Sequence, residues 1–474
     1  MRLIATIICI AGIIGLFYLD RDRKLRTSKA LWIPLIWLMI HCSRPVSAWI
    51  NGGVISSVTS LEVYTEGSPI DAAAHGILIV AGLLILSLRL RQVGRFLRGN
   101  TALLLFFAYC ALSIAWSDQP LVALKRWIKE VGDIAMVLVI LTDLNPQAAI
   151  KWVFSRTAFV LLPLSVLFIR YYGAIGRGYS RDWGVFAIGV TTFKNELGAI
   201  CLVFGLVSLW SFVATYKNRL TPHRSRHLAA RGSIVFLAVV LCKVADSMTS
   251  LACFLISGAI VVLTSRKWFI KRPRSVLALV CGCVILALFA LFFDESGTMV
   301  HALGRQTNLT GRTDIWKAIL SIHTNPLVGS GFESFWMGSR IQQLNDMLQT
   351  KGLQEAHNGY LEVYLNLGLA GIALLGNVIV TGYRKSLTVF RQDPDGGGIR
   401  LALLTAVVIY CLTEAGFRIM GPIWFIFLVA VTFVPSSLRS KERQPAAESP
   451  DAQWQDELRE GHAIEESPQL VYND

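Results

Sequence analysis

Two adjacent polar residues, His357 and Asn358, have side chains suited to proton transfer from a hydroxyl group. Histidine titrates close to neutral pH, so a neutral imidazole can accept a proton or fix the position of the group that carries it. We expect His357 to act in this way, with Asn358 as its orienting hydrogen-bond partner. Small residues recur at helical spacing within 368–371, which predicts a tightly packed helix with His357 at its outer mouth.

Lys194 stands at the start of another predicted helix, and Arg177 and Arg181 precede it in the same connection. The unpaired N–H groups at a helix amino terminus favour an anion such as phosphate, and nearby cations strengthen that preference. The sequence therefore predicts an anion site here, with Lys194 as a point charge and the two arginines as substrate-binding candidates. The structural alternative is that Lys194 only reaches toward lipid headgroups.

We expect Arg312 to be the direct phosphate contact, because its planar guanidinium can bind phosphate through two parallel hydrogen bonds. Arg305 precedes it as a substrate-binding candidate. Arg312 could instead be a solvated charge paired with Asp314. Glu414 and Arg418 are four residues apart, so they either line the substrate site together or form an ion pair with each other.

The composition of the chain indicates a membrane protein and excludes a soluble enzyme. Of the 474 residues, 54% are hydrophobic and only 16% are charged, whereas soluble domains have about 25% charged residues. The mean hydropathy is +0.54. The net charge is +14, but the cations fall between apolar stretches rather than on one polar surface, so we expect no nucleic-acid partner.

Apolar stretches recur from residue 3 to residue 434, and a helix that spans a membrane needs about 20 mostly apolar residues. We therefore predict an all-α fold, a polytopic membrane helix bundle of about 12–13 transmembrane helices with one long folded external loop. The candidate spans are 3–19, 30–50, 70–88, 101–116, 121–142, 153–172, 196–215, 233–250, 251–265, 275–293, 359–381, 401–413 and 421–435.

Basic residues cluster in every second connection between these spans, which is typical of the cytoplasmic side of a membrane protein. This pattern places the amino terminus outside and the carboxyl terminus in the cytoplasm. Residues 1–435 are the predicted integral membrane domain. Residues 436–474 are polar and lack a periodic apolar pattern, so we predict a disordered cytoplasmic tail.

The connection 294–358 is too long for a plain loop. Its aromatic residues, among them Trp316, Phe335 and Trp336, argue that it folds. Residues 313–322 have the apolar spacing of a short amphipathic helix. On the predicted orientation this segment is external, and we expect it to cover the site as a lid.

The motif residues combine into a known pattern. They are Lys194 with Gly198, His357 and Asn358 followed by Gly368 and Gly371, and the stretches 311–316 and 326–332. Together they resemble the O-antigen ligase and polymerase superfamily, over a core of about 190–420 with a long periplasmic loop at about 294–358. The stretches 43–49 and 193–198 look more like the bacterial exopolysaccharide polymerases of the succinoglycan type.

This resemblance implies a metal-independent, inverting membrane glycosyltransferase with a GT-C-like fold, at the periplasmic face of the bacterial inner membrane. Its donor would be an oligosaccharide linked to undecaprenyl diphosphate, and its acceptor another glycan in exopolysaccharide biosynthesis. Chain-length regulator and flippase proteins would be its partners within the bilayer. His357, Arg312 and Lys194 would be the catalytic residues, because fixed cations can stabilise the departing diphosphate in place of a metal.

Two alternatives remain open. An O-antigen ligase that transfers glycan to lipid A core would share these motifs and differ in its acceptor. A lipid-linked oligosaccharide flippase or transporter is the alternative from another class, but such folds often contain two related halves, and the sequence shows no internal repeat. The nine cysteines form no CxxC pair and have no histidine at zinc spacing, so we expect no disulfide, metal or cofactor.

Overall fold

The computed structural model describes residues 1–21, 27–53, 68–179, 184–292, 310–348 and 355–433. For residues 290–292 and 310–314 it describes the backbone alone. The chain divides into the unit Met1–Phe433 and the segment Val434–Asp474. The predicted tail 436–474 therefore lies outside the described residues.

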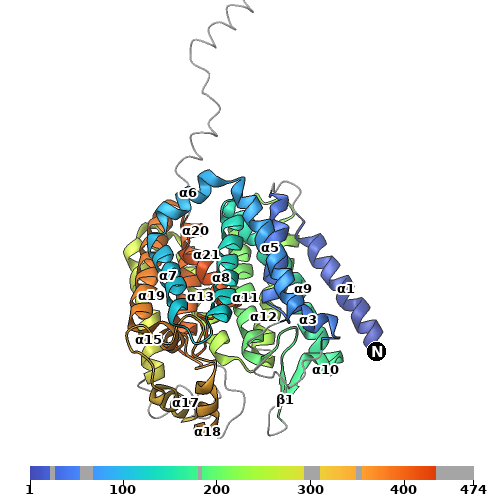
Figure 1. Ribbon diagram of the computed structural model, residues 1–474. Helices are drawn as coiled ribbons and strands as arrows, with labels where there is room; N and C mark the ends of the chain where they lie inside the picture. The colour runs from blue at the N-terminus through green and yellow to red at the C-terminus, as the bar shows by residue number, and fades with distance from the viewer. Residues whose placement is uncertain (22–26, 54–67, 180–183, 293–309, 349–354, 434–474) are drawn as a thin grey trace, which may run out of the picture. The chain divides into compact units, whose positions relative to one another are not determined.

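The described residues fold almost entirely into helices (Figure 1). In chain order the helices are α1 (Arg2–Leu19), η1 (Lys29–Leu31), α2 (Trp32–His41), α3 (Val46–Ile50), α5 (Pro69–Ser87), α6 (Leu90–Gly99), α7 (Thr101–Leu112), η2 (Ser113–Trp116), α8 (Pro120–Leu141), α9 (Pro146–Tyr171), α10 (Gly173–Gly176), α11 (Lys194–Lys217), α12 (Arg224–Val244), α13 (Met248–Thr264), α14 (Lys267–Lys271), α15 (Pro273–Phe292), α17 (Thr310–Ser321), α18 (Ser339–Leu348), α19 (Gly359–Gln392), α20 (Pro394–Tyr410) and α21 (Pro422–Val431). Strands β1 (Arg177–Tyr179) and β2 (Val185–Ala187) pair antiparallel, with Arg177 opposite Ala187. Apart from this hairpin the described fold is all-α, as predicted.

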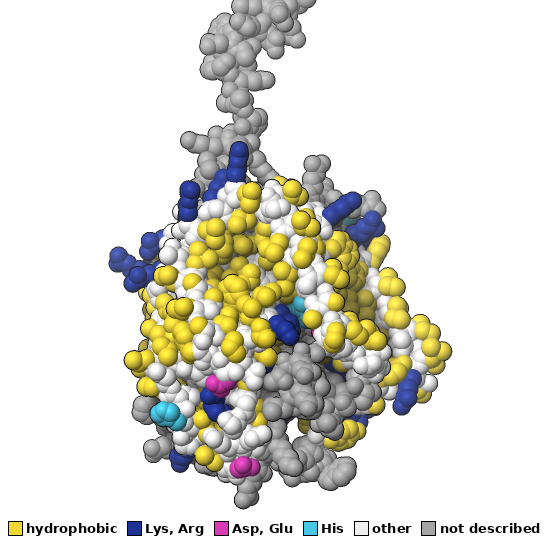
Figure 2. Space-filling model, viewed as in Figure 1, with side chains coloured by type: hydrophobic (Ala, Val, Ile, Leu, Met, Phe, Trp, Pro, Cys, Tyr) yellow, Lys and Arg dark blue, Asp and Glu magenta, His cyan; other side chains and the backbone are white. Residues whose placement is uncertain are grey.

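Six described helices, α1, α5, α9, α11, α12 and α19, are long and apolar enough to cross a membrane. A seventh span results if Leu90–Gly99 and Thr101–Trp116, which meet at 89°, count as one. Large apolar side chains on α1 and α5 are exposed, including Ile8 at 66% and Ile77 at 69%. Figure 2 shows hydrophobic side chains over much of the described face. Such a surface suits lipid, and the protein is a polytopic membrane helix bundle as predicted.

The predicted span 30–50 is wrong as a single helix. Helix α2 ends at His41, and a new helix begins only after Pro45. Proline fixes its backbone torsion and has no N–H to donate, so it interrupts a helix. Arg44 is 1% exposed, and its guanidinium donates to the carbonyl of Gly189 at 3.1 Å. The chain turns here because a buried arginine joins this turn to the segment before α11.

Helix α11 packs among α9, α12, α13, α20 and α21. Its apolar side chains are buried around its circumference, and Ile200 and Phe204 are fully enclosed. A helix that is hydrophobic all round is typical of a bundle core. Gly205 permits the close packing, since a Cβ there would lie 2.9 Å from the ring of Phe254. Because α11 begins at Lys194, this enclosed helix fixes the position of a predicted site cation.

Helix α19 is broken at Gly368, where φ is +63° and ψ is −165°. The segment 326–331 lies against the break and bonds to the freed backbone groups, for example through the N–H of Gly331 to the carbonyl of Asn366 at 2.8 Å. A Cβ at Gly368 would lie 2.3 Å from the carbonyl of Leu327. Non-helical backbone in a membrane bundle requires such partners. Gly368 of α19 is therefore needed for the close contact between the segment 326–331 and the break in the helix.

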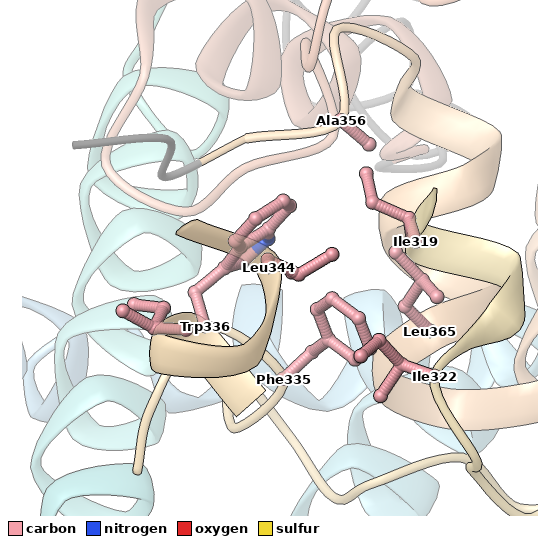
Figure 3. Packing of buried hydrophobic residues seen from close by; sticks show 8 residues of the cluster. Ile319, Ile322, Phe335, Trp336, Leu344, Ala356 and Leu365 are labelled. Carbon is pink, nitrogen blue, oxygen red and sulfur yellow. The ribbon is translucent and has the colours of Figure 1, made fainter. Parts of the chain in front are cut away.

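The described part of the segment 294–358 has a hydrophobic core of its own (Figure 3). Ile319 of α17 and Phe335 are fully buried in it. The indole N–H of Trp316 donates to the carbonyl of Ala356 at 2.7 Å. Ala356 directly precedes His357, so the folded segment holds the predicted catalytic residue by its backbone.

Candidate active site

A cavity of about 650 Å³ lies between α8, the start of α11 and the loops that flank α19 and follow α20. Its ionisable lining residues are His41, Arg126, Lys129, Lys194, Glu196, Glu333, Glu355, His357, Glu414 and Arg418. Apolar side chains, including those of Phe186, Phe193 and Ile423, line other parts. A large cavity with apolar walls and a few convergent polar groups is typical of a substrate site.

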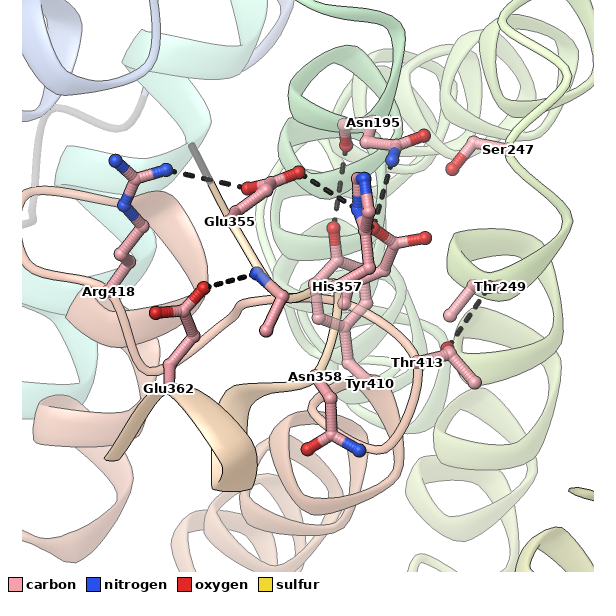
Figure 4. A network of polar contacts seen from close by, with 12 residues as sticks. Asn195, Ser247, Thr249, Glu355, His357, Asn358, Glu362, Tyr410, Thr413 and Arg418 are labelled. Carbon is pink, nitrogen blue, oxygen red and sulfur yellow. Dashed lines mark hydrogen bonds and ion pairs between the residues drawn. The ribbon is translucent and has the colours of Figure 1, made fainter. Parts of the chain in front are cut away.

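His357 lies between two carboxylates in this cavity (Figure 4). Its Nδ1 is 2.9 Å from Oε1 of Glu355 and 3.5 Å from Oε2 of Glu414. The second oxygen of Glu355 is 3.5 Å from Nη1 of Arg418. Asn195 donates through Nδ2 to Oε2 of Glu414 at 2.9 Å. These contacts connect the start of α11, the residues before α19 and the loop after α20 into one polar cluster.

The two carboxylates determine the charge of His357. Burial lowers the pKa of the ring, but the contacts and charges of Glu355 and Glu414 outweigh burial and raise the pKa to about 9. His357 is therefore an imidazolium at neutral pH, and the prediction of a neutral imidazole is wrong. With both ring nitrogens protonated, Nε2 is a second donor beside the Nδ1 that faces the carboxylates.

Backbone strain is concentrated at this cavity. Five described residues other than glycine have positive φ, and three of them, Glu333 (+51°), His357 (+50°) and Met420 (+59°), line the cavity. A fourth, Asp246 (+52°), pairs with the cavity residue Lys194. Such a backbone costs roughly 1–3 kcal/mol for each residue and clusters at functional sites. The strain therefore supports a functional role for this cavity.

Lys194 lies where the sequence places it, in the first turn of α11, and it lines the cavity. Its Nζ is 3.7 Å from a carboxylate oxygen of Asp246, and the two side chains are 42% and 73% exposed. An exposed pair of this kind is weak, so Lys194 can exchange this partner for an anionic ligand. Glu414 and Arg418 line the same cavity, as the binding-site interpretation of this pair predicts.

Asn358 has a different contact from the predicted one. Its Oδ1 accepts the N–H groups of Tyr360 and Leu361 at 3.0 Å each and thereby caps α19. Its Nδ2 donates to the carbonyl of Leu412 at 3.2 Å. The amide therefore positions His357 through the backbone, and Glu355 contacts the ring in its place.

The other predicted cations are not brought to the cavity within the described residues. Arg177 lies on β1, and its Nε donates to the carbonyl of Ile169 at 2.8 Å, which ties the hairpin to α9. Arg181 and Arg305 lie outside the described residues. Arg312 lies in the first turn of α17, where the backbone alone is described. The predicted roles of these last three arginines stay predictions.

Several residues of this cavity were not predicted from the sequence, among them Glu355, Asn195, Arg126 and Lys129. Glu355 lies two residues before His357, and Asn195 directly follows Lys194, so proximity in sequence could have indicated both. Arg126 and Lys129 lie on α8, more than sixty residues before Lys194 (194 − 129 = 65). The sequence feature that could have indicated Arg126 and Lys129 is a group of charged residues within an otherwise apolar span. Charges in such a span usually mark a functional position.

Glu355, His357 and Glu414 could also hold a metal ion, because one ligand atom from each lies within 4.8 Å of the others. Carboxylate and imidazole ligands together suit several divalent metals. A metal would have to displace the ring proton, since a ligating imidazole is neutral. The expectation that no metal is needed stays a prediction, and removal of metal can test it.

Known proteins share the part of the chain that contains His357. Residues 233–376 match the family model described as O-Antigen ligase. The matched region includes α13, the segment with α17 and α18, and α19 as far as residue 376. The predicted resemblance to this superfamily is confirmed.

Several proteins that are similar to this chain have names that refer to polysaccharides. The exopolysaccharide production protein ExoQ of Rhizobium meliloti (strain 1021) is 26% identical over 306 residues, which are 61% of this chain and 66% of that protein. Two rickettsial proteins provisionally named as polysaccharide ligases are 22% identical. The match covers 57% of this chain and 64% of the protein from Rickettsia prowazekii (strain Madrid E), and 71% and 81% for Rickettsia bellii (strain RML369-C). The chain thus spans just under two thirds of the rhizobial relative's length.

Proposed function

We propose that this protein is a membrane glycosyltransferase that polymerises or ligates polysaccharide, with the cavity at His357 as its active site. The observation that carries the proposal is the charged cluster of His357, Glu355, Glu414 and Arg418, which opens on a cavity of about 650 Å³. His357 lies in the region that matches the O-antigen ligase family model. The relatives' names, exopolysaccharide production and polysaccharide ligation, agree with this activity.

The proposed donor is a glycan on undecaprenyl diphosphate, the substrate implied by the family resemblance. Departure of a diphosphate leaves negative charge on its oxygens, and fixed cations in a site of low dielectric constant stabilise that charge. Lys194, Arg418 and the His357 imidazolium supply positive charge at one cavity. These cations allow the proposed transfer to proceed without a metal.

A protonated His357 cannot accept a proton, so the general base must be one of the carboxylates beside it. Glu355 is the better placed of the two, because its side chain is 32% exposed and that of Glu414 is 6% exposed. The acceptor hydroxyl gives its proton to Glu355 while its oxygen bonds to the anomeric carbon. The bond from that carbon to the diphosphate oxygen breaks, and its electron pair leaves with the diphosphate. Attack from the opposite side inverts the anomeric configuration.

The proposed orientation places this cavity toward the periplasm. In Figure 1, α17, α18 and β1 lie at one end of the described bundle and α6 at the other. Arg91, Arg95 and Arg98 lie on α6, and Figure 2 shows Lys and Arg side chains gathered toward that end. Basic residues collect on the cytoplasmic side of membrane proteins, so α6 is cytoplasmic and α17 periplasmic in this proposal. In bacteria with two membranes, this corresponds to the inner membrane.

Polymerisation of exopolysaccharide repeat units is the first candidate reaction, because the rhizobial relative is 26% identical and the rickettsial ones 22%. Ligation is the second candidate, since the rickettsial proteins are named as polysaccharide ligases. Lipid A core is the acceptor that the family resemblance implies for this reaction. A flippase or transporter would move lipid-linked glycan without changing its length, and this difference separates the third alternative from the other two.

The test uses the purified protein in liposomes, supplied with undecaprenyl diphosphate-linked repeat units. A polymerase lengthens the lipid-linked glycan, and a ligase extends only added lipid A core. His357→Gln is the matched inactive control. Treatment with EDTA is expected to leave the rate within about twofold, because the cavity cations take the role that a metal would have. Unchanged glycan length with both acceptors would contradict the proposal.

A further inference from the structure

Helix α8 brings two cations to the cavity from an element other than those that carry His357. Arg126 and Lys129 are three residues apart, so they share one face of the helix, and both line the cavity. The guanidinium of Arg126 donates to the carbonyl of Glu333 at 2.6 Å and lies 3.9 Å from its carboxylate. Arg126 is thus fixed in place by the strained residue Glu333.

Lys129 has no direct partner of this kind. Within the described part of the chain, the structure shows no ion pair or hydrogen bond for its ammonium group. Asp71 of α5 acts on it through its charge alone, and the carboxylate of Asp71 accepts from the N–H and the hydroxyl of Ser47. The acids of its own helix accept indole N–H groups, Asp133 that of Trp37 at 2.7 Å and Glu130 that of Trp424. A cation within an apolar bundle is costly unless a partner compensates it, so an anionic ligand in the cavity would stabilise Lys129 directly.

The chemistry of the two side chains indicates a phosphate ligand. Arg126 presents a planar donor group held in one position, which suits oxygen atoms of a phosphate. Lys129 is a flexible point charge that can approach the same anion. Lys194 and Arg418 line the cavity from α11 and from the loop after α20. The cavity thus has cations on separate elements, an arrangement that suits a ligand with two linked phosphates.

We propose that Lys129 and Arg126 form an anion subsite on α8 that binds the diphosphate of the lipid-linked donor, in addition to the cations near His357. This inference rests on the proposed function, since it names the residues that hold the donor in that site. The bound donor gives the Lys129 ammonium a direct anionic partner. The ligand is the diphosphate group and not the acceptor glycan.

The test measures binding of undecaprenyl diphosphate without a glycan to the purified full-length protein in detergent. Lys129→Gln is expected to weaken binding by about 10–100-fold, and Lys129→Arg to restore most of it, because hydrogen bonds to charged groups contribute strongly. Lys125→Gln is the matched control, since Lys125 lies on the same helix, is exposed and does not line the cavity. Its affinity should stay at the wild-type value.

Other outcomes would contradict either the anion subsite or the proposed function. Equal affinity of Lys129→Gln and Lys125→Gln, or no binding to the wild type, would overturn the subsite. A Lys129→Gln enzyme with a raised KM for the acceptor and an unchanged KM for the donor would also overturn it. If Lys129→Gln weakens binding while the wild type transfers no glycan, the subsite stands and the proposed function fails. If the wild type transfers glycan and Lys129→Gln binds normally, the subsite alone fails.

Discussion

Two clusters of acidic side chains in this bundle differ in what surrounds them. On α8, Asp133 and Glu130 are 0% and 2% exposed. Each accepts a neutral indole N–H, Asp133 that of Trp37 at 2.7 Å and Glu130 that of Trp424. Nδ1 of His41 also lies 3.4 Å from Asp133, and among the described residues the second oxygen of Glu130 has no hydrogen-bond partner. This cluster is closed to solvent and joins α2, α8 and α21, so its hydrogen bonds hold helices together.

The second cluster, at the cavity, has ionic partners and is open. The side chains of Glu355 and His357 are 32% and 27% exposed, and His357 has a left-handed backbone. Arg418 and the imidazolium supply positive charge where the first cluster has neutral donors. Burial of a carboxylate does not by itself separate the two clusters, since the side chain of Glu414 is only 6% exposed. Ionic partners, backbone strain and access to a cavity together mark the second cluster as the chemical one.

The largest predicted effect is the loss of activity on substitution of His357 in the cavity cluster. His357→Gln is expected to lower kcat/KM by about 10²–10⁴-fold, the usual contribution of a group engaged in proton transfer or charge stabilisation. Its Tm should also fall, because the contacts with Glu355 and Glu414 that raise the pKa of His357 stabilise the folded state at neutral pH, so kcat/KM is compared below the Tm of the variant. Glycan transfer and thermal unfolding of the same preparation measure both. Wild-type kcat/KM in this variant would remove His357 from the site.

The pH dependence should follow the protonation of His357. Its pKa is raised to about 9, so the imidazolium is present at neutral pH and disappears as the pH rises through that value. We expect kcat/KM to fall about tenfold for each pH unit above 9. The charge also stabilises the fold, fully below pH 6.5 and no longer above about 9, because the folded-state pKa exceeds the unfolded one. An activity that instead rises through pH 9 would identify neutral His357 as the base.

The closed cluster should affect stability. Asp133→Ala leaves the buried indole N–H of Trp37 without its acceptor, which costs about 1–3 kcal/mol of unfolding free energy. Denaturation in detergent measures this loss, and kcat for each folded molecule should change less than for His357→Gln. Trp37→Phe is the matched control, because it removes the donor of the same bond. If Asp133→Ala keeps full stability but loses turnover, the buried cluster on α8 takes part in catalysis and is not purely structural.

The smallest predicted effect concerns the cap that positions His357. Asn358→Ala removes the side chain that accepts the N–H groups of Tyr360 and Leu361 and should cost about 1 kcal/mol. Asn358→Asp keeps an acceptor at the same position and should retain most of the stability. A loss of activity in both variants without any change in Tm would instead indicate direct contact of Asn358 with substrate.

The helices of this protein could largely be predicted from sequence, because lipid-facing and core segments both need long apolar runs. The span 30–50 failed since Pro45 and the buried Arg44 make a turn that hydropathy does not register. Lys194 and His357 were placed in one site through motif resemblance, and the structure brings both to the same cavity.

The rest of the site depends on contacts between distant parts of the chain. Glu414 is 57 residues after His357 (414 − 357 = 57), and only the folded chain places it 3.5 Å from the ring, where it helps to make His357 a cation. Arg126 and Lys129 likewise reach the cavity through the packing of α8. A local sequence pattern shows neither relation.

We propose that the protein transfers glycan from a lipid diphosphate at the His357 cavity. The most direct test is the analysis of lipid-linked glycans in a strain that lacks this gene and carries either the wild type or His357→Gln at equal membrane level. Single lipid-linked repeat units are expected to accumulate with His357→Gln, whereas the wild type converts them to polymer. Normal polymer with His357→Gln would contradict this proposal.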